Sequence, residues 1–192
     1  MKKDPDAILM TAFRNGDKQA FRLLFDKHKK KIVNFCYRFC NNRETAEDLA
    51  QEVFLKVYKA APAYQANAKF TTWLYKIATN VCLNEVRRPV YRVRTDSLDA
   101  EEADHTNFRK QLADPQSISP DAHFEKKEND HMILEAIAKL PQTQRAAILL
   151  LVDQGFSYQE IARQINRSES GVKSLIHRAR ATLKDALKFC SQ

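Results

Sequence analysis

The chain reads FSYQEIARQINRSESGVKSLIHRARATLKDAL over residues 156–187, and this stretch predicts two helices joined by a tight turn. Ser157 and Glu160 have the spacing of a capping box, which begins the first helix. Asn166 tolerates positive φ and is placed to make the turn, after which Ser168 begins the second helix. With the small Ala162 where the helices cross, the pattern is typical of a DNA-reading helix-turn-helix. An ordinary helical hairpin with a solvated basic face is the alternative.

The second of these helices has one apolar and one polar face. Its apolar residues recur at helical spacing and predict a packed side, made of Val172, Leu175, Ile176, Ala179, Leu183 and Leu187. The remaining positions point outward and are mostly polar or basic: Glu169, Ser170, Lys173, Ser174, His177, Arg178 and Arg180. This outward face is the candidate DNA-reading surface.

Length and composition favour an all-α protein. The 192 residues leave room for one or two domains, only 3 are Gly, and strand-type alternation is nowhere sustained. The longest apolar run, residues 146–152, is far below the roughly 18 residues that a membrane span needs. No secretory signal follows Met1, so we expect a soluble, cytoplasmic protein. The four cysteines lie in apolar helical sequence and are expected to be reduced: Cys36, Cys40, Cys82 and Cys190.

The net charge of +8 is unevenly distributed along the chain. Residues 1–94 contain 19 basic and 9 acidic side chains, residues 95–131 contain 4 and 10, and residues 132–192 contain 9 and 5. Two basic blocks separated by an acidic one suggest two nucleic-acid-facing domains joined by a linker that DNA repels. A basic surface that is merely solvated is the alternative. We expect domains at 1–90 and 131–192, and a flexible acidic linker at 91–130.

The first domain is predicted to contain four helices, at about 6–14, 17–40, 43–60 and 71–88. In the third, Ala46, Leu49, Ala50, Val53 and Val57 form the core stripe. Its other side combines acidic, amide and large apolar groups: Asp48, Gln51, Glu52, Phe54 and Leu55. Because DNA repels acidic groups, this side is a candidate docking surface for a protein, with a solvated helix face as the alternative.

The loop at 61–69 and the helix after it carry a second candidate site. Tyr64 lies in the loop, and the helix places Lys76, Asn80, Asn84, Arg87 and Arg88 on a stripe beside the one that carries Trp73. Asn pairs with an adenine edge, and aromatic rings near cations stack on unpaired bases. Trp73 is alternatively a core residue. In the second domain, a helix from 132 to 140 and another from Pro141 to Gly155 are predicted to precede the helix-turn-helix.

Four motifs occur in order across both predicted domains. They are RxxAEDLxQExF from Arg43, FxTWLxxIAxN from Phe70, LPxxxR from Leu140, and YxEIA from Tyr158 followed by VKSxxxRAR from Val172. Together they resemble the extracytoplasmic-function (ECF) sigma factors, two-domain members of the sigma-70 family of bacterial RNA polymerase sigma factors. One motif alone is a weak signal, whereas four in register are specific.

The resemblance implies a role for each candidate site. The helix at 43–60 is expected to bind core RNA polymerase through Asp48, Gln51, Glu52, Phe54 and Leu55. The loop and the fourth helix are expected to capture the minus-ten element of promoter DNA with Tyr64, Trp73, Lys76, Asn80, Asn84, Arg87 and Arg88. The recognition helix is expected to read the minus-thirty-five element with Ser168, Glu169, Ser170, Lys173, Ser174, His177 and Arg178.

The resemblance also implies partners and helps to weigh other functions. Core RNA polymerase, promoter DNA and a cognate anti-sigma factor are expected partners, without a cofactor, metal or small-molecule substrate. A stand-alone helix-turn-helix regulator and a polymerase-binding antagonist are the alternatives, and binding to core polymerase and to DNA separates the three. An enzyme is disfavoured, because no phosphate-binding Gly loop, metal-spaced Cys/His set or Ser/His/Asp arrangement is evident.

Overall fold

The computed structural model describes residues 4–87 and 131–188, which form helices and turns without a strand. The N-terminal half contains α1 (Pro5–Arg14), α2 (Lys18–Cys40), α3 (Arg43–Ala60), the 3-10 helix η1 (Ala61–Ala63) and α4 (Phe70–Arg87). In the C-terminal half, residues 131–138 are helical and are followed by α8 (Gln142–Gln154), α9 (Tyr158–Ile165) and α10 (Glu169–Lys188). The predicted all-α class is confirmed. The predicted linker at 91–130, Arg88 and Cys190 lie outside the described residues.

Short polar side chains set most of the helix ends that the sequence predicts. Asp17 accepts hydrogen bonds from the first amides of α2, and Asn42 accepts one from the Thr45 amide of α3 at 2.9 Å. Asn41 ends α2 in the left-handed conformation, with φ 52°. One boundary differs from the prediction. Pro141 lies just outside α8 with extended ψ, so the helix begins at Gln142.

Asp4 caps two helices at once, which fixes α1 against the start of α4. Its Oδ1 accepts from the Asp6 amide at 3.1 Å, and its Oδ2 accepts from the Phe70 amide at 2.7 Å. The second bond joins residues 66 positions apart in the chain. Local sequence therefore predicted the existence of α4, but its first residue depends on a side chain from the N-terminus.

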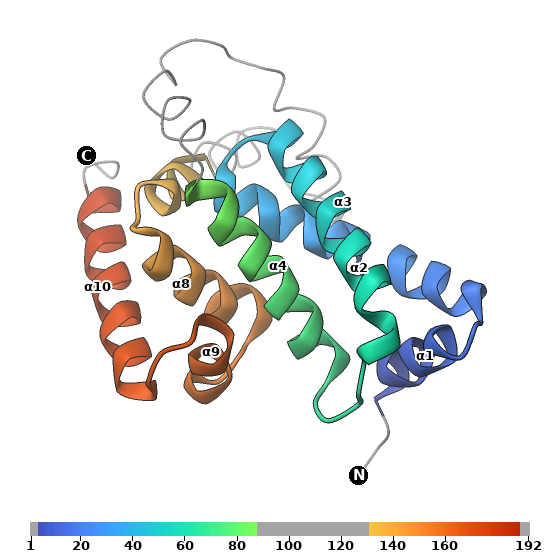
Figure 1. Cartoon of the computed structure of the whole chain (residues 1–192). Helices are drawn as coiled ribbons and strands as arrows, with labels where there is room; N and C mark the ends of the chain where they lie inside the picture. Colours follow the sequence, from blue (N-terminus) through green and yellow to red (C-terminus); the bar gives the residue numbers. More distant parts are fainter. Residues whose placement is uncertain (1–3, 88–130, 189–192) are drawn as a thin grey trace, which may run out of the picture.

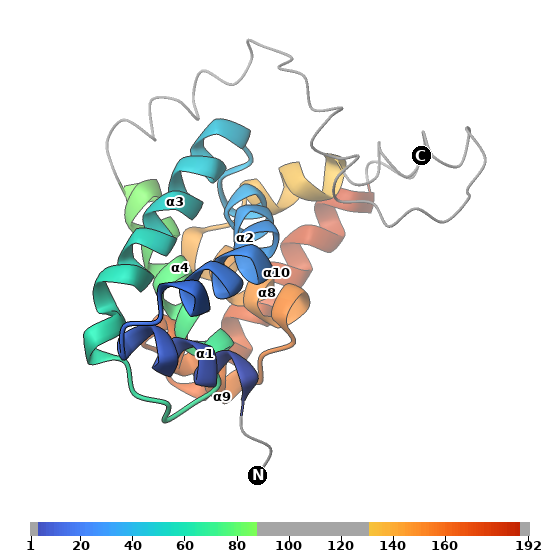
Figure 2. The same cartoon turned by 90° about the vertical axis from the view of Figure 1, so that its right-hand side faces the viewer.

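Helix α4 lies at the centre of the molecule. It packs on α2 and α3 on one side and on α8 and α9 on the other, and the two views in Figure 1 and Figure 2 show this arrangement. One continuous cluster of buried apolar side chains extends across both halves of the chain. The described residues of the two predicted domains therefore pack against each other directly.

Several contacts join the halves. The ring of Phe156 meets the ring of Tyr75 edge-on, with centroids 5.9 Å apart. Arg145, from the LPxxxR motif, is 5% exposed and donates to the Phe39 carbonyl of α2 as well as to carbonyls of its own half. Arg38 pairs with Asp153, whose pKa is raised by burial while the Arg38 charge opposes that shift. Carbonyls from both halves accept hydrogen bonds from the terminal nitrogens of this buried guanidinium, which makes the packing specific.

A second buried polar group lies between α1 and α2. Asp6 accepts from Lys27 Nζ at 2.5 Å, and its other oxygen lies 2.9 Å from His28 Nε2. Burial lowers the pKa of His28, and the neighbouring Asp6 opposes that shift. Three cysteines are buried in this half as thiols, namely Cys36, Cys40 and Cys82.

Candidate functional site

The helix-turn-helix is formed by α9 and α10, and its turn has the predicted chemistry. Ser157 and Glu160 complete the capping box, with the Ser157 amide donating to Glu160 at 2.9 Å. Asn166 makes the turn with φ 52°, and Ser168 Oγ accepts from the Gly171 amide at 3.1 Å. Ile161, Ala162, Val172 and Ile176 are buried where the helices meet. This packing holds α10 by one face and leaves the opposite face free.

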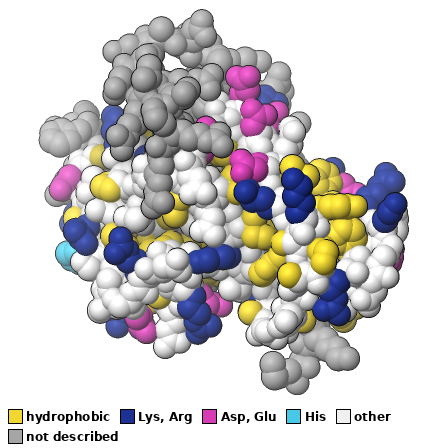
Figure 3. Space-filling model, in the orientation of Figure 1, with side chains coloured by type: hydrophobic (Ala, Val, Ile, Leu, Met, Phe, Trp, Pro, Cys, Tyr) yellow, Lys and Arg dark blue, Asp and Glu magenta, His cyan; other side chains and the backbone are white. Residues whose placement is uncertain are grey.

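The outward face of α10 carries the residues predicted for the minus-thirty-five element. Six of the seven are exposed: Ser168, Ser170, Lys173, Ser174, His177 and Arg178. Glu169 is half-buried and lies 3.7 Å from Lys173 Nζ. Figure 3 shows Lys and Arg side chains and a histidine over this side of the molecule. The fold brings these residues together on one polar surface, whose cations are Lys173 and Arg178.

The structure leaves some of the residues predicted for the minus-ten element exposed and engages others in internal contacts. Asn80 and Asn84 are exposed on α4. Lys76 instead donates to the end of α9, at 2.7 Å to the Arg163 carbonyl and 2.5 Å to the Gln164 carbonyl, and it also reaches Asn166 Oδ1 at 3.2 Å. Its burial lowers the pKa of the Lys76 ammonium.

In this arrangement the Lys76 ammonium serves as a C-terminal cap for α9, where a cation is favourable. Gln164 adds a bond in the other direction, from its Nε2 to the Thr72 carbonyl of α4 at 2.6 Å. The side chain of Arg87 and all of Arg88 lie outside the described structure. Of the predicted basic stripe, the structure therefore shows one member, and that member is engaged with the other half.

Tyr64 and Trp73 are packed more deeply than a base-stacking surface requires. Tyr64 is 2% exposed, which corrects the expectation that its ring is available to an unpaired base. Its ring meets the ring of Trp73 edge-on, with centroids 5.0 Å apart, and the ring of Phe70 with centroids 6.3 Å apart. Trp73 itself is half-buried. Arg14 Nη1 donates to the Tyr64 carbonyl at 2.9 Å, which ties this part of the loop to the end of α1. Tyr64 is a core residue in this structure.

The surface of α3 matches its predicted mixture of acidic and apolar groups with one correction. Asp48 and Gln51 are exposed, Leu55 is 53% exposed, and Glu52 is half-buried and pairs with Lys56 at 3.3 Å. Phe54, expected on the open face, is only 7% exposed because its ring packs edge-on against Phe25 of α2 at 4.8 Å. Figure 3 shows hydrophobic side chains gathered over this side of α3.

A groove of about 420 Å³ runs between α2 and α3 beside this surface. Phe25, Val33, Ala50 and Phe54 supply its apolar wall, and the polar residues around it are Lys29, Lys30, Asn34, Arg43, Glu47 and Gln51. Phe25 and its neighbours on α2 were not predicted as site residues. The sequence predicts only a helix at 17–40 here, and the groove exists because α3 lies alongside α2.

Within residues 4–87 and 131–188, no group of three or more His, Cys, Asp or Glu side chains has a metal-binding arrangement. Over the same residues, no helix has the length and apolar content to cross a membrane.

Comparisons with known proteins match both halves of the chain. The family model for sigma-70 region 2 matches residues 24–92, and that for sigma-70 region 4 matches residues 130–183. The chain is 32% identical to the RNA polymerase sigma-H factor of Pseudomonas aeruginosa over 188 residues, which are 98% of this chain and 96% of that protein. It is 34% identical to the ECF RNA polymerase sigma factor SigW of Bacillus subtilis over 91% of this chain and 92% of that protein.

A solved structure shows the same fold. The sigma factor RpoE from Bartonella quintana, determined in complex with the anti-sigma factor NepR, superposes with a TM-score of 0.64 at 23% identity. The match covers 88% of this chain and 96% of that one.

A helix-turn-helix half matched by the region 4 model, together with a second helical half matched by the region 2 model, identifies a transcription initiation factor. The chain belongs to the sigma-70 family and is an RNA polymerase sigma factor of the ECF type. The family resemblance expected from the four motifs is confirmed.

Proposed function

We propose that the chain docks on core RNA polymerase through α3 and places α4 and α10 on the two promoter elements. The assignment of α3 to the polymerase and of α10 to DNA rests on one observation. The acidic and apolar groups lie on α3, whereas the basic and polar groups lie on the outward face of α10. A surface rich in carboxylates suits a protein partner, and a polar basic helix face suits the major groove.

On α3, the docking contacts are assigned to the exposed Asp48, Gln51 and Leu55 with the half-buried Glu52 at their edge. Leu55 supplies apolar area, and the carboxylates orient the partner. Phe54 contributes through the wall of the adjacent groove rather than as an exposed anchor. The partner surface that fits is therefore one with an apolar ridge flanked by basic groups.

At the minus-ten element, Asn80 and Asn84 are the base-edge candidates, with Arg87 and Arg88 as phosphate candidates beyond them. Trp73 remains a stacking candidate only through its exposed portion. Lys76 joins this set when its ammonium leaves the end of α9, because the three acceptors there use its three N–H donors. Use of Lys76 on DNA thus requires the two halves to separate.

At the minus-thirty-five element, α10 enters the major groove with Ser170, Lys173, Ser174 and His177 toward the base edges. Ser168 and Glu169 lie at its first turn, where backbone amides favour contact with a phosphate. Hydrogen-bonding side chains without large apolar groups on this face are suited to direct readout of bases.

No catalytic chemistry is assigned to this chain, since the polymerase supplies the active site. Because core polymerase and promoter DNA are its proposed partners, we place its action in the cytoplasm. A cognate anti-sigma factor is a further proposed partner, supported by the similarity in fold to a sigma factor solved with one.

Co-elution with core RNA polymerase in gel filtration tests the proposal. The wild type is expected to co-elute, and the variant Asp48→Lys, Glu52→Lys is expected not to, because two contact carboxylates become cations. A matched control, Glu135→Lys, Asp185→Lys, makes the same change of charge at exposed positions of the other half and is expected to co-elute. Failure of the wild type to bind core would overturn the assignment of α3 and favour a stand-alone DNA-binding regulator.

A further inference from the structure

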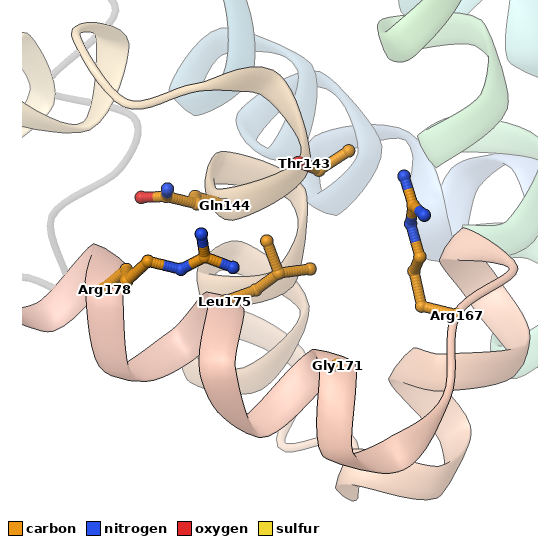
Figure 4. A pocket seen from close by; sticks show the side chains of 6 residues that line it. All are labelled: Thr143, Gln144, Arg167, Gly171, Leu175 and Arg178. Atoms are coloured by element: carbon orange, nitrogen blue, oxygen red, sulfur yellow. The ribbon is translucent and has the colours of Figure 1, made fainter.

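A pocket of about 360 Å³ lies beside the recognition helix, between the first turn of α8 and the N-terminal part of α10. Its lining consists of Thr143, Gln144, Arg167, Gly171, Leu175 and Arg178. Figure 4 shows Arg178 extending along α10 toward Leu175 and Arg167 rising from the turn before α10 on the other side. Thr143 and Gln144 of α8 lie across from the helix.

The charge of this pocket is positive and uncompensated. Its lining contains two guanidinium groups and no carboxylate. In the part of the chain that the structure describes, neither arginine forms an ion pair, and the recorded side-chain bond of Arg178 is from its Nε to the Ser174 carbonyl at 3.3 Å. The terminal nitrogens of both groups are therefore available to an anion, and a guanidinium matches the oxygens of a phosphate.

The position of the pocket around α10 indicates where that anion comes from. With about 100° per residue, Gly171, Leu175 and Arg178 form a stripe roughly a third of a turn from the stripe of Ser170, Ser174 and His177. The major groove is about 12 Å wide, and a helix with its side chains is about 10–12 Å across. When one stripe faces the bases, the flanking stripe faces the wall of the groove, which is the sugar-phosphate backbone.

We propose that this pocket binds a single backbone phosphate of promoter DNA, held jointly by Arg167 and Arg178. The inference rests on the proposed docking of α10 and deepens it in two ways. Arg167, which sequence reasoning missed, becomes a DNA contact, and Arg178 becomes a phosphate contact rather than a reader of bases. Phosphate contacts position the protein without reading sequence.

The test is fluorescence anisotropy of the full chain with two labelled 25-base-pair duplexes, one rich in A·T and one rich in G·C, over a range of KCl concentrations. All six lining residues lie in the C-terminal half, so the assay needs neither core polymerase nor separation of the halves. Arg167→Gln and Arg178→Gln are each expected to weaken binding roughly tenfold, the loss of a charge-assisted hydrogen bond. The factor is expected to be equal for the two duplexes.

The salt dependence distinguishes a shared phosphate from separate ones. The slope of log K against log[KCl] is negative. The double variant is expected to reduce its magnitude by about 0.9, the value for one phosphate. A control, Arg22→Gln, Lys59→Gln, removes two exposed charges from the N-terminal half and sets the baseline. Arg167→Lys keeps the charge, so it is expected to retain the slope while losing affinity.

Four results would overturn the inference. A double variant with the slope of the control would show that no phosphate is bound, and a decrease of about 1.8 would show two separate phosphates. Unequal losses on the two duplexes would show base contacts. Calorimetry with inorganic phosphate tests whether the ligand is a free anion. Phosphate binding by the wild type, with no change of DNA affinity in the arginine variants, would also contradict the proposal. The DNA-binding measurement does not involve core polymerase. The phosphate site and the docking of α3 on core polymerase can therefore be disproved independently.

Discussion

His28 shows how one buried side chain sets a pH dependence. The residue is 3% exposed, its Nε2 lies 2.9 Å from Asp6 Oδ2, and its buried Nδ1 has no hydrogen-bond partner in the structure. Burial lowers the pKa of His28 below its ordinary value of 6.5. The folded chain therefore binds this proton less readily than the unfolded chain, and its stability decreases as the pH falls through that value.

We accordingly predict a lower melting temperature at pH 5.5 than at pH 7.5, measured by circular dichroism. His28→Gln is expected to reduce the difference, because glutamine donates to Asp6 from a similar position and does not titrate in this range. Equal pH sensitivity of variant and wild type would assign the effect to other groups.

Two neighbouring residues on α3 are predicted to have opposite roles. Phe54 is 7% exposed and Leu55 is 53% exposed, although both were expected on the open face. Phe54→Ala is expected to cost about 3–5 kcal/mol of stability, as for other buried aromatic residues. Leu55→Ala is expected to change stability by about 0.5 kcal/mol or less while weakening binding to core polymerase. Urea denaturation and core titration measure the two effects, and a large stability loss for Leu55→Ala would contradict its assignment to docking.

Helix α9 illustrates what local signals contribute to an element. It has only 8 residues, too few for stability in isolation, and its capping box satisfies amides that the short helix leaves free. Ser157→Ala is expected to destabilise the folded chain by about 1 kcal/mol. The neighbouring Gln159→Ala, at an exposed helical position, is the control and is expected to be nearly neutral. Equal melting temperatures for the two variants would show that the capping box does not stabilise α9.

At the scale of the whole molecule, the packing of the two halves is predicted to depend on the contacts between α4 and α9. Lys76→Met with Gln164→Ala removes four recorded hydrogen bonds across this boundary, and we expect it to weaken the association by roughly 2 kcal/mol in total. A larger radius of gyration in small-angle X-ray scattering is the expected result. Lys59→Met, which removes an exposed charge from α3, is the control.

An unchanged radius of gyration in the double variant would show that the apolar contacts suffice to hold the halves together. The ring contact between Tyr75 and Phe156 and the buried Arg145 would then be the next positions to vary. The outcome bears on promoter binding, because Lys76 contacts DNA in our proposal only after it leaves α9.

The sequence by itself determined the helices, most of their ends and the family. Capping residues such as Ser157, Asp17 and Asn166 act within a few residues of their partners, and apolar spacing selects the buried face of each helix. The outward residues of α10 were predicted for the same reason. Four motifs in register then identified the sigma-70 resemblance.

Only the tertiary structure decided which polar and aromatic groups are free to bind a partner. Lys76 meets Asn166 from 90 residues away, and the packing of α2 on α3 takes Phe54 out of solvent. The pocket that holds Arg167 and Arg178 likewise needs α8 beside α10. Such burial and hydrogen bonding arise between segments that are distant in the chain, so no local pattern contains them.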